Sequence, residues 1–456
     1  MPLLGLPWLR TPRDFAGAVR RVVDLAASLK TDLALNLARV QECRAVEIVD
    51  DFSNELCKVL DASEVVRGAH VDAEWRREAE SARAELFSLC SKLNRSSALA
   101  TALSRAQEKG GGRSREERRV LDNLQAEMVS SGDQVVEESL DALSDAFLRN
   151  IRASPPPADL TSTSDSRRRE AYFKTLQSPG ENLSVVADIL ALRSHLANQS
   201  GISEGGFAAR ALRVNSMAVA PSTAINFLRD LSARVRPLAR AQHRELFDFA
   251  RSSGLSTGGR IEPWDHLHLE RAARAGADGA ALSQYFSLGN CLRGIGMVLE
   301  ETFGLRWSVE EVGGEGGEAQ DEPWCPGLLR MTISDGEEDL GVVYLDLFWR
   351  AGKAKQSAHY VVQTPRREKS QGGAQRAIVV LLCAFGPQGG GHGSPTSFLL
   401  HPREVEVLFH EFGHALHTML SVGSFHYLSG TRGECDFIEV PSTLFEKFAL
   451  HPACIR

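Results

Sequence analysis

The sequence contains no apolar run long enough to cross a membrane and no strong excess of charge of either sign. Its longest apolar run, Ala377 to Phe385, is about half the length that a membrane-spanning helix needs. The formal net charge is −7, from 52 Lys and Arg against 59 Asp and Glu spread along the chain. This balance favours neither a nucleic-acid-binding surface nor a membrane-binding patch. We therefore expect a monomer that acts on a small or peptidic substrate, with no nucleic acid and no membrane as partner.

Closely spaced cysteines and a secretory signal are also missing. The eight cysteines lie far apart without a C-x-x-C pair, so a disulfide scaffold is not expected in a chain of 456 residues. We interpret the cysteines as reduced thiols, mostly in the core. The first thirty residues contain several arginines, but Asp14, Asp24 and a helical apolar pattern indicate a folded helix and no clear transit peptide.

Most of the chain has the apolar periodicity of helices. This pattern extends from Thr11 to about Leu148 and from Glu170 to about Phe303. The intervening stretch, residues 152–169, contains three consecutive prolines and cannot continue a helix. It marks the predicted boundary between an N-terminal helical region, residues 1–155, and a second domain, residues 156–456.

Several short segments after Phe303 have the composition of β-strands, because they are rich in Val, Ile and aromatic residues and are bounded by turn residues. They are residues 328–334, 340–351, 358–363 and 377–385. The chain is therefore predicted to be mostly α, with a small β-sheet beside the helices. The glycine-rich segments 313–322 and 386–395 lack the lysine and the strand-to-helix placement of a phosphate-binding loop, so we interpret them as surface loops.

A metal-ligand pattern lies in "LFHEFGHALHTML", residues 408–420. On a helix, the apolar residues of this segment form one stripe, and His410, His414 and His417 lie on the opposite face. His410 and His414 are four residues apart, so both imidazoles can bind one ion, with Glu411 beside them to hold a water. This is the H-E-x-x-H pattern in its required helical setting. His417 either hydrogen-bonds to a ligand or is simply an exposed polar residue.

A catalytic zinc site needs three protein ligands and one open position, so another ligand must follow. The extended metzincin pattern would place it at Leu420, which excludes that class. Downstream, "SGTRGECDFIEVPSTLFEKFA" offers Glu434, Asp436, Glu439 and Glu446. Asp436 and Glu439 resemble a capping box that opens a helix, which places Glu439 in the first turn as the third ligand. Glu446 lies on the same face, where it either orients a ligand histidine or is a surface carboxylate.

The two motifs together resemble those of a known family. "LFHEFGHALH" and "SGTRGECDFIEVPS" are similar to segments of the zinc metallopeptidases that include thimet oligopeptidase, neurolysin and mitochondrial intermediate peptidase. The resemblance implies one Zn2+ per chain, bound by His410, His414 and Glu439, and it implies that Glu411 is the general base that activates a zinc-bound water. Further similar segments extend the resemblance over nearly the whole chain: residues 262–265, 285–305, 340–353 and 379–385.

Within the family, "GLPWLRTPRDF", "SKLNRSSAL" and "DLFWRAGK" favour the mitochondrial intermediate peptidase branch. The resemblance implies a zincin-like fold with two helical lobes around a deep channel, and residues 156–456 as the catalytic domain. It implies a metalloendopeptidase that cuts short unfolded peptides. The mitochondrial branch trims an octapeptide from imported precursor proteins, which places the expected enzyme in the mitochondrial matrix. A cytosolic thimet-type oligopeptidase is the alternative with the same site.

One departure from the family lies at the end of the chain. Family members continue beyond the third ligand into a glycine-rich segment whose histidine and tyrosines contact the scissile carbonyl and the substrate. This chain stops at "FALHPACIR", so the resemblance implies a catalytic domain that is incomplete at its C-terminal end. The competing hypothesis is therefore a non-catalytic form that binds zinc or peptides without cleaving them.

Overall fold

The computed structural model divides the chain into two compact units, which we describe separately. The sheet unit comprises residues 1–128 and 282–456, and the helical unit comprises residues 129–281. Within them the structure describes residues 1–38, 44–108, 114–130, 134–152, 162–176, 179–199, 206–255, 259–273, 283–314, 321–353, 357–367, 374–386 and 394–452. The predicted boundary at residues 155 and 156 lies outside the described residues, so the proposed domain division stays a prediction.

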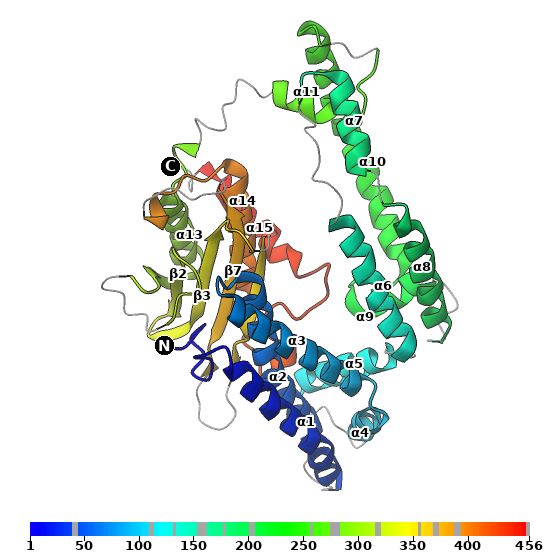
Figure 1. Ribbon diagram of the computed structural model, residues 1–456, viewed down its shortest axis with the longest axis vertical. Helices are drawn as coiled ribbons and strands as arrows, with labels where there is room; N and C mark the ends of the chain where they lie inside the picture. Colours follow the sequence, from blue (N-terminus) through cyan, green and yellow to red (C-terminus); the bar gives the residue numbers. More distant parts are fainter. Residues whose placement is uncertain are drawn as a thin grey trace. The chain divides into compact units, whose positions relative to one another are not determined.

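The elements confirm a mostly α chain with a small sheet (Figure 1). The helices of the sheet unit are α1 (Asp14–Ala38), α2 (Ala45–Ala69), α3 (Ala73–Asn94), α4 (Ser97–Glu108), most of α5 (Arg115–Ser130), α13 (Leu288–Phe303), α14 (Pro402–Leu420) and α15 (Glu439–Ala449). Its short 3-10 helices are η1 (Pro395–Ser397) and η2 (His426–Leu428). Its strands are β1 (Arg306–Glu311), β2 (Leu329–Asp335), β3 (Glu338–Phe348), β4 (Ala358–Gln363), β5 (Arg366–Arg367), β6 (Ala374–Gln375) and β7 (Ala377–Phe385).

The helical unit is built from α6 (Gln134–Arg152), α7 (Asp165–Leu176), α8 (Glu181–Gln199), α9 (Gly206–Asn215), α10 (Pro221–Ser252) and α11 (His266–Ala273). A buried ion pair joins the start of α7 to the segment before α11. Arg168 Nε donates to Asp265 Oδ1 over 3.0 Å, and both side chains are buried. Among the described residues of the whole chain, none of the helices combines the length and the apolar character that crossing a bilayer requires.

The main sheet has the strand order β1-β2-β3-β7-β4. β3 and β7 pair in parallel and the other neighbours pair antiparallel, so the sheet is mixed. The segments expected to be strands correspond to β2, β3, β4 and β7, which confirms those predictions. The strand β1 was not predicted, because "RWSVEE" is short, polar and only partly buried.

Helices cover both faces of this sheet (Figure 1). On one face, Val343, Leu345 and other alternate side chains pack into a core with α13, α14 and α15. On the other face, Tyr344 and Val380 pack with α1, α2 and α3. The expectation that the sheet lies beside the helices was therefore incomplete. In a strand that is covered on both faces, the side chains of both faces are buried and apolar. This explains the continuous apolar run of β7.

A buried carboxylate fixes the end of β3. Asp346 is 2% exposed and accepts hydrogen bonds from Trp324 Nε1 at 2.9 Å, Arg350 Nη1 at 2.6 Å and Lys353 Nζ at 2.7 Å. Burial would raise the pKa of Asp346, but Arg350 and Lys353 outweigh burial and hold this pKa below its ordinary value. Because removal of one partner leaves buried charge unpaired, this network should contribute strongly to the stability of the sheet unit.

We predict that Asp346→Asn lowers the free energy of unfolding by about 3 kcal/mol or more, since it leaves the buried Lys353 ammonium without its counter-charge. Urea denaturation followed by circular dichroism measures this change. A lowered pKa in the folded state means that the contribution is present above pH 4 and is lost as the pH falls below the ordinary aspartate value. Asp339→Asn, at an exposed carboxylate paired with Arg376, is the control and should cost little. Equal stability of the two variants would contradict the prediction.

Candidate metal centre

The helix α14 carries the H-E-x-x-H pattern and is anchored at its first turn. Pro402 is its first residue, and the Glu404 carboxylate accepts the backbone N–H of His401 at 2.8 Å, as in a capping box. The same carboxylate accepts the backbone N–H of Gly386 at 3.0 Å, which ties the helix start to the end of β7. The buried stripe that includes Leu408 and Phe412 then packs against the sheet. The predicted amphipathic helix is confirmed.

Two histidines of α14 and one glutamate of α15 point at a common position. The Nε2 atom of His410 lies 3.4 Å from Glu439 Oε2, and the Nε2 atom of His414 lies 3.2 Å from the same oxygen. In a tetrahedral zinc site, ligand atoms about 2.05 Å from the ion are about 3.3 Å apart. The spacing of these nitrogen and oxygen atoms therefore fits a zinc ion.

The orientations of the two rings fit the same ion. The imidazoles of His410 and His414 cross at an interplanar angle of 82°, so their in-plane lone pairs can converge. His414 is buried, and desolvation lowers its pKa in spite of the neighbouring Glu439 carboxylate. A neutral imidazole is the form that binds a metal. These three residues form one of the clusters in the described chain that could hold an ion.

A second cluster joins His359 of β4 to Glu411 and His414. The rings of His359 and His414 are stacked, with centroids 4.3 Å apart and an interplanar angle of 14°. Each nitrogen lone pair lies in the plane of its own ring, so two nearly parallel rings cannot direct their lone pairs at one ion. The geometry therefore favours the cluster of His410, His414 and Glu439 over the cluster that contains His359.

Two further residues orient the candidate ligands. Glu446, two turns after Glu439 on α15, lies with Oε1 at 2.7 Å from His410 Nδ1. When Nε2 faces an ion, Nδ1 carries the hydrogen and donates it to this carboxylate, which fixes the ring. Ser442 Oγ donates to Glu439 Oε2 at 3.0 Å, and this serine is fully buried.

A glycine sets the distance between α14 and α15. A Cβ atom added at Gly413 would lie 2.7 Å from Ser442 Cα and 2.8 Å from Phe445 Cβ. These distances are too short for any other residue, so Gly413 allows the two helices to pack backbone against backbone. The close packing brings Glu439 to the histidines of α14.

Glu411 lies on the other side of His414, next to β4. Its side chain is buried, and its carboxylate accepts the backbone N–H of His359. Burial raises the pKa of Glu411, and the nearby Glu439 carboxylate raises it further. A carboxylate with a raised pKa accepts a proton more readily and so suits a general base.

The remaining predicted residues, His417 and Asp436, are not part of the cluster formed by His410, His414 and Glu439. His417 is half-buried with its ring edge-to-face against Phe437, and its Nδ1 has no hydrogen-bond partner in the described part of the chain. Asp436 is exposed. The capping box expected from Asp436 and Glu439 was wrong, because the N-cap of α15 is Ile438 and makes no side-chain capping bond. Turns that begin at Glu434 lead the chain into α15 instead.

Sequence reasoning assigned no role to Gly413, Ser442 or His359. Gly413 occupies a free position of H-E-x-x-H, and only the neighbouring helix shows why it must be small. Ser442 follows Glu439 by three residues, a spacing that places both on one helix face and could have indicated the contact. His359 lies on a strand far from the motif in sequence, so no local signal could have identified it.

Comparisons with known proteins point to the same chemistry. The sequence model described as peptidase family M3 matches residues 160–456. A relative from Arabidopsis thaliana, described as "Mitochondrial intermediate peptidase, mitochondrial", is 26% identical over 98% of this chain and 70% of its own length. Relatives from Mus musculus and Homo sapiens, described as "Mitochondrial intermediate peptidase", are each 29% identical over 98% of this chain and 66% of their own length. The chain thus spans about two thirds of the length of these curated relatives.

We predict that Gly413→Ala weakens metal binding, because the added methyl group pushes α15 and Glu439 away from α14. We expect zinc affinity to fall at least tenfold, measured by competition with a chromogenic chelator, with roughly 1–3 kcal/mol of lost stability from overpacking. Gly294→Ala on α13 is the matched control, since its Cβ would meet Phe409 Cζ at an ordinary 3.8 Å. Unchanged zinc affinity in Gly413→Ala would contradict this account of the helix contact.

Proposed function

Because this chain belongs to peptidase family M3, we propose that it is a zinc-dependent metalloendopeptidase that hydrolyses short, unfolded peptides. The observation that carries the proposal is the distance from one oxygen of Glu439 to the Nε2 atoms of His410 and His414, 3.4 and 3.2 Å. These separations suit the edges of a zinc tetrahedron and leave a fourth position open. In this proposal His410, His414 and Glu439 hold one zinc ion per chain.

Bound zinc would lower the pKa of a water and polarise the scissile carbonyl of the substrate. Glu411 acts as the general base: its carboxylate takes a proton from the attacking water and delivers it to the leaving amine. The backbone N–H of His359 holds this carboxylate in place through a hydrogen bond. Its raised pKa makes the carboxylate of Glu411 a better proton acceptor than an exposed glutamate.

The other polar residues of the centre act by positioning. Glu446 accepts the Nδ1 hydrogen of His410, and Ser442 donates to the Glu439 carboxylate. Both contacts fix the rotation of a ligand before an ion binds, which reduces the cost of ordering the site. His417 and Asp436 remain proposed supporting residues.

The relatives' descriptions support a finer proposal. Proteins described as mitochondrial intermediate peptidase match 98% of this chain. We infer that the substrates are precursor proteins in the mitochondrial matrix, from which the enzyme trims a short N-terminal peptide. The expected zincin-like arrangement of two helical lobes around a channel belongs to this proposal. A cytosolic oligopeptidase of the thimet type shares the site, and the location of the full-length protein in cells separates the two.

We predict one zinc ion per chain, measured by mass spectrometry of metal content in the purified protein. His410→Ala and Glu439→Ala should lose it, because two remaining ligands cannot hold zinc tightly. Glu446→Gln should retain zinc with roughly 10- to 100-fold lower affinity, since it removes only an orienting partner. Glu411→Gln should retain zinc fully. A wild-type protein that binds no zinc would refute the proposed site.

We further predict that the zinc-loaded chain cleaves a quenched fluorescent peptide and that 1,10-phenanthroline abolishes the cleavage until zinc is restored. Glu411→Gln should reduce the rate by about 10² to 10⁴, the usual contribution of a general base. Glu406→Gln is the matched control, because Glu406 is an exposed glutamate on the same helix. Bound zinc without any turnover would instead support the hypothesis of a non-catalytic zinc- and peptide-binding form.

A further inference from the structure

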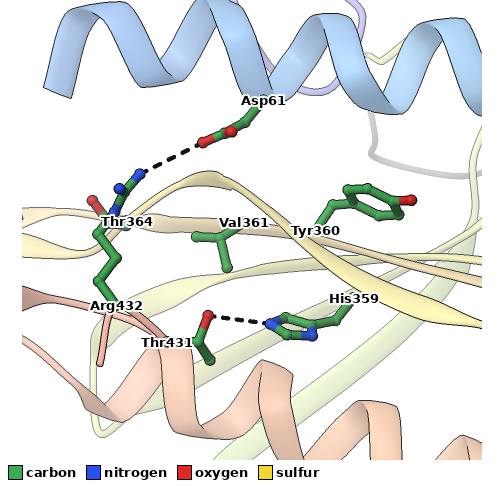
Figure 2. Close-up of a pocket in the computed structure, with 7 residues that line it drawn as sticks. All are labelled: Asp61, His359, Tyr360, Val361, Thr364, Thr431 and Arg432. Carbon is green, nitrogen blue, oxygen red and sulfur yellow. Dashed lines mark hydrogen bonds and ion pairs between the residues drawn. The ribbon is translucent and has the colours of Figure 1, made fainter. Parts of the chain in front are cut away.

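A cavity of about 270 Å³ is drawn in Figure 2, and one of its lining residues, His359, is in contact with His414 of the metal centre. Its walls come from α2, from β4 and from the segment that leads to α15, and it is lined by Asp61, His359, Tyr360, Val361, Thr364, Thr431 and Arg432. His359 connects the cavity to the centre, because its ring stacks on that of His414. Thr431 Oγ1, at 3.2 Å from His359 Nε2, fixes that ring on the cavity side. The cavity is therefore within reach of a molecule that is bound at the metal centre.

Two charged side chains face each other across one end of the cavity (Figure 2). Arg432 Nη2 lies 3.7 Å from Asp61 Oδ2, which is longer than a direct hydrogen bond. Each of the two side chains is 33% exposed. The guanidinium also bonds to the thiol of Cys57 on α2. Because the ion pair is loose and still reaches solvent, Arg432 retains N–H donors for a ligand.

The two charges respond differently to a ligand. An arginine side chain stays protonated under all ordinary conditions. Asp61 is different: burial, reinforced by Glu64 and opposed by Arg432, raises its pKa to about 7. The cavity can therefore accept an anion by protonating Asp61, but it cannot accept a cation by discharging Arg432. This asymmetry favours a negatively charged ligand.

We propose that this cavity is a carboxylate-binding subsite for the peptide substrate, in which Arg432 binds either an acidic side chain or the terminal carboxylate of the peptide. The planar guanidinium suits a carboxylate because it presents two parallel N–H donors. Tyr360 and Val361 supply the neighbouring wall for the carbon atoms of the ligand. The inference rests on the proposed peptidase function and adds a preference for one chemical class of substrate residue.

The test uses the zinc-loaded full chain with Glu411→Gln, which suppresses turnover, and three kinds of fluorescent peptide of otherwise identical sequence. The neutral reference has glutamine residues and a C-terminal amide. The second carries one glutamate, placed in turn at each glutamine position, and the third has a free C-terminal carboxylate. Fluorescence anisotropy should show that at least one carboxylate peptide binds about tenfold more tightly than the reference, the usual value of a charge-assisted hydrogen bond. The peptide that gains affinity identifies which carboxylate occupies the cavity.

Arg432→Gln should abolish the preference for carboxylate. The double variant Asp61→Asn/Arg432→Gln should do the same without leaving the half-buried Asp61 carboxylate unpaired. Arg376→Gln removes an arginine with a 64% exposed side chain and should keep the preference. In Asp61→Asn the preference should persist but lose its dependence on pH between 6 and 8, whereas the parent should bind carboxylate more tightly at pH 6. The charged and titratable groups around Asp61 are Arg432, Glu64, Cys57, Tyr360 and His359.

Equal binding of all the peptides by the parent protein would overturn the subsite and leave the proposed function standing. A uniform loss of affinity for every peptide in the Arg432 variants would also overturn it, because that result indicates only a structural role. Failure of every peptide to bind would overturn the proposed function together with the subsite.

Discussion

The contact between α14 and α15 at Gly413 is the constraint on which the metal centre depends. The two candidate histidines lie on α14 and the candidate carboxylate ligand lies on α15, so the helices must approach within a distance that excludes a side chain. The buried rings of Phe412 and Phe445, with centroids 5.7 Å apart, pack beside this contact. Their burial supplies the free energy that holds the backbones together. The metal centre is thus a product of the hydrophobic core beneath it.

Buried carboxylates hold the surrounding segments in place. Asp50 of α2 accepts the backbone N–H groups of His426 and Tyr427 at 2.9 and 2.8 Å, and so fixes the connection between α14 and α15. Asp346 does the same for the end of β3. Each carboxylate is satisfied by several donors, which makes its burial tolerable and its removal costly. Residues from the first seventy positions therefore help to shape a site whose ligands all lie beyond residue 400.

The polar groups around the centre have distinct electrostatic roles. Desolvation lowers the pKa of His414 and raises that of Glu411, so one is a neutral ligand and the other a ready proton acceptor. Glu446 supports His410 from the side away from Glu439. On the α2 side of β4, Arg432 provides a permanent positive charge next to a carboxyl group that can become neutral. The edge strand β4 separates the two environments and lines both through His359.

Sequence alone determined the elements that local chemistry controls. Apolar periodicity predicted the long helices, and composition with bounding turn residues predicted four strands. The spacing of His410 and His414 placed both on one helix face with Glu411 beside them, because side chains four apart on a helix share a face. The need for a third ligand made Glu439 a candidate, although the capping box expected there does not form. Glu446 was a candidate because it lies seven residues further on the same face, but sequence could not show whether it met a histidine or solvent. Only the tertiary structure decided that, as it decided the roles of Gly413, Ser442 and His359 and the sheet's place between two helical layers. These depend on contacts between segments far apart in the chain, and no local pattern encodes the distance between two packed helices.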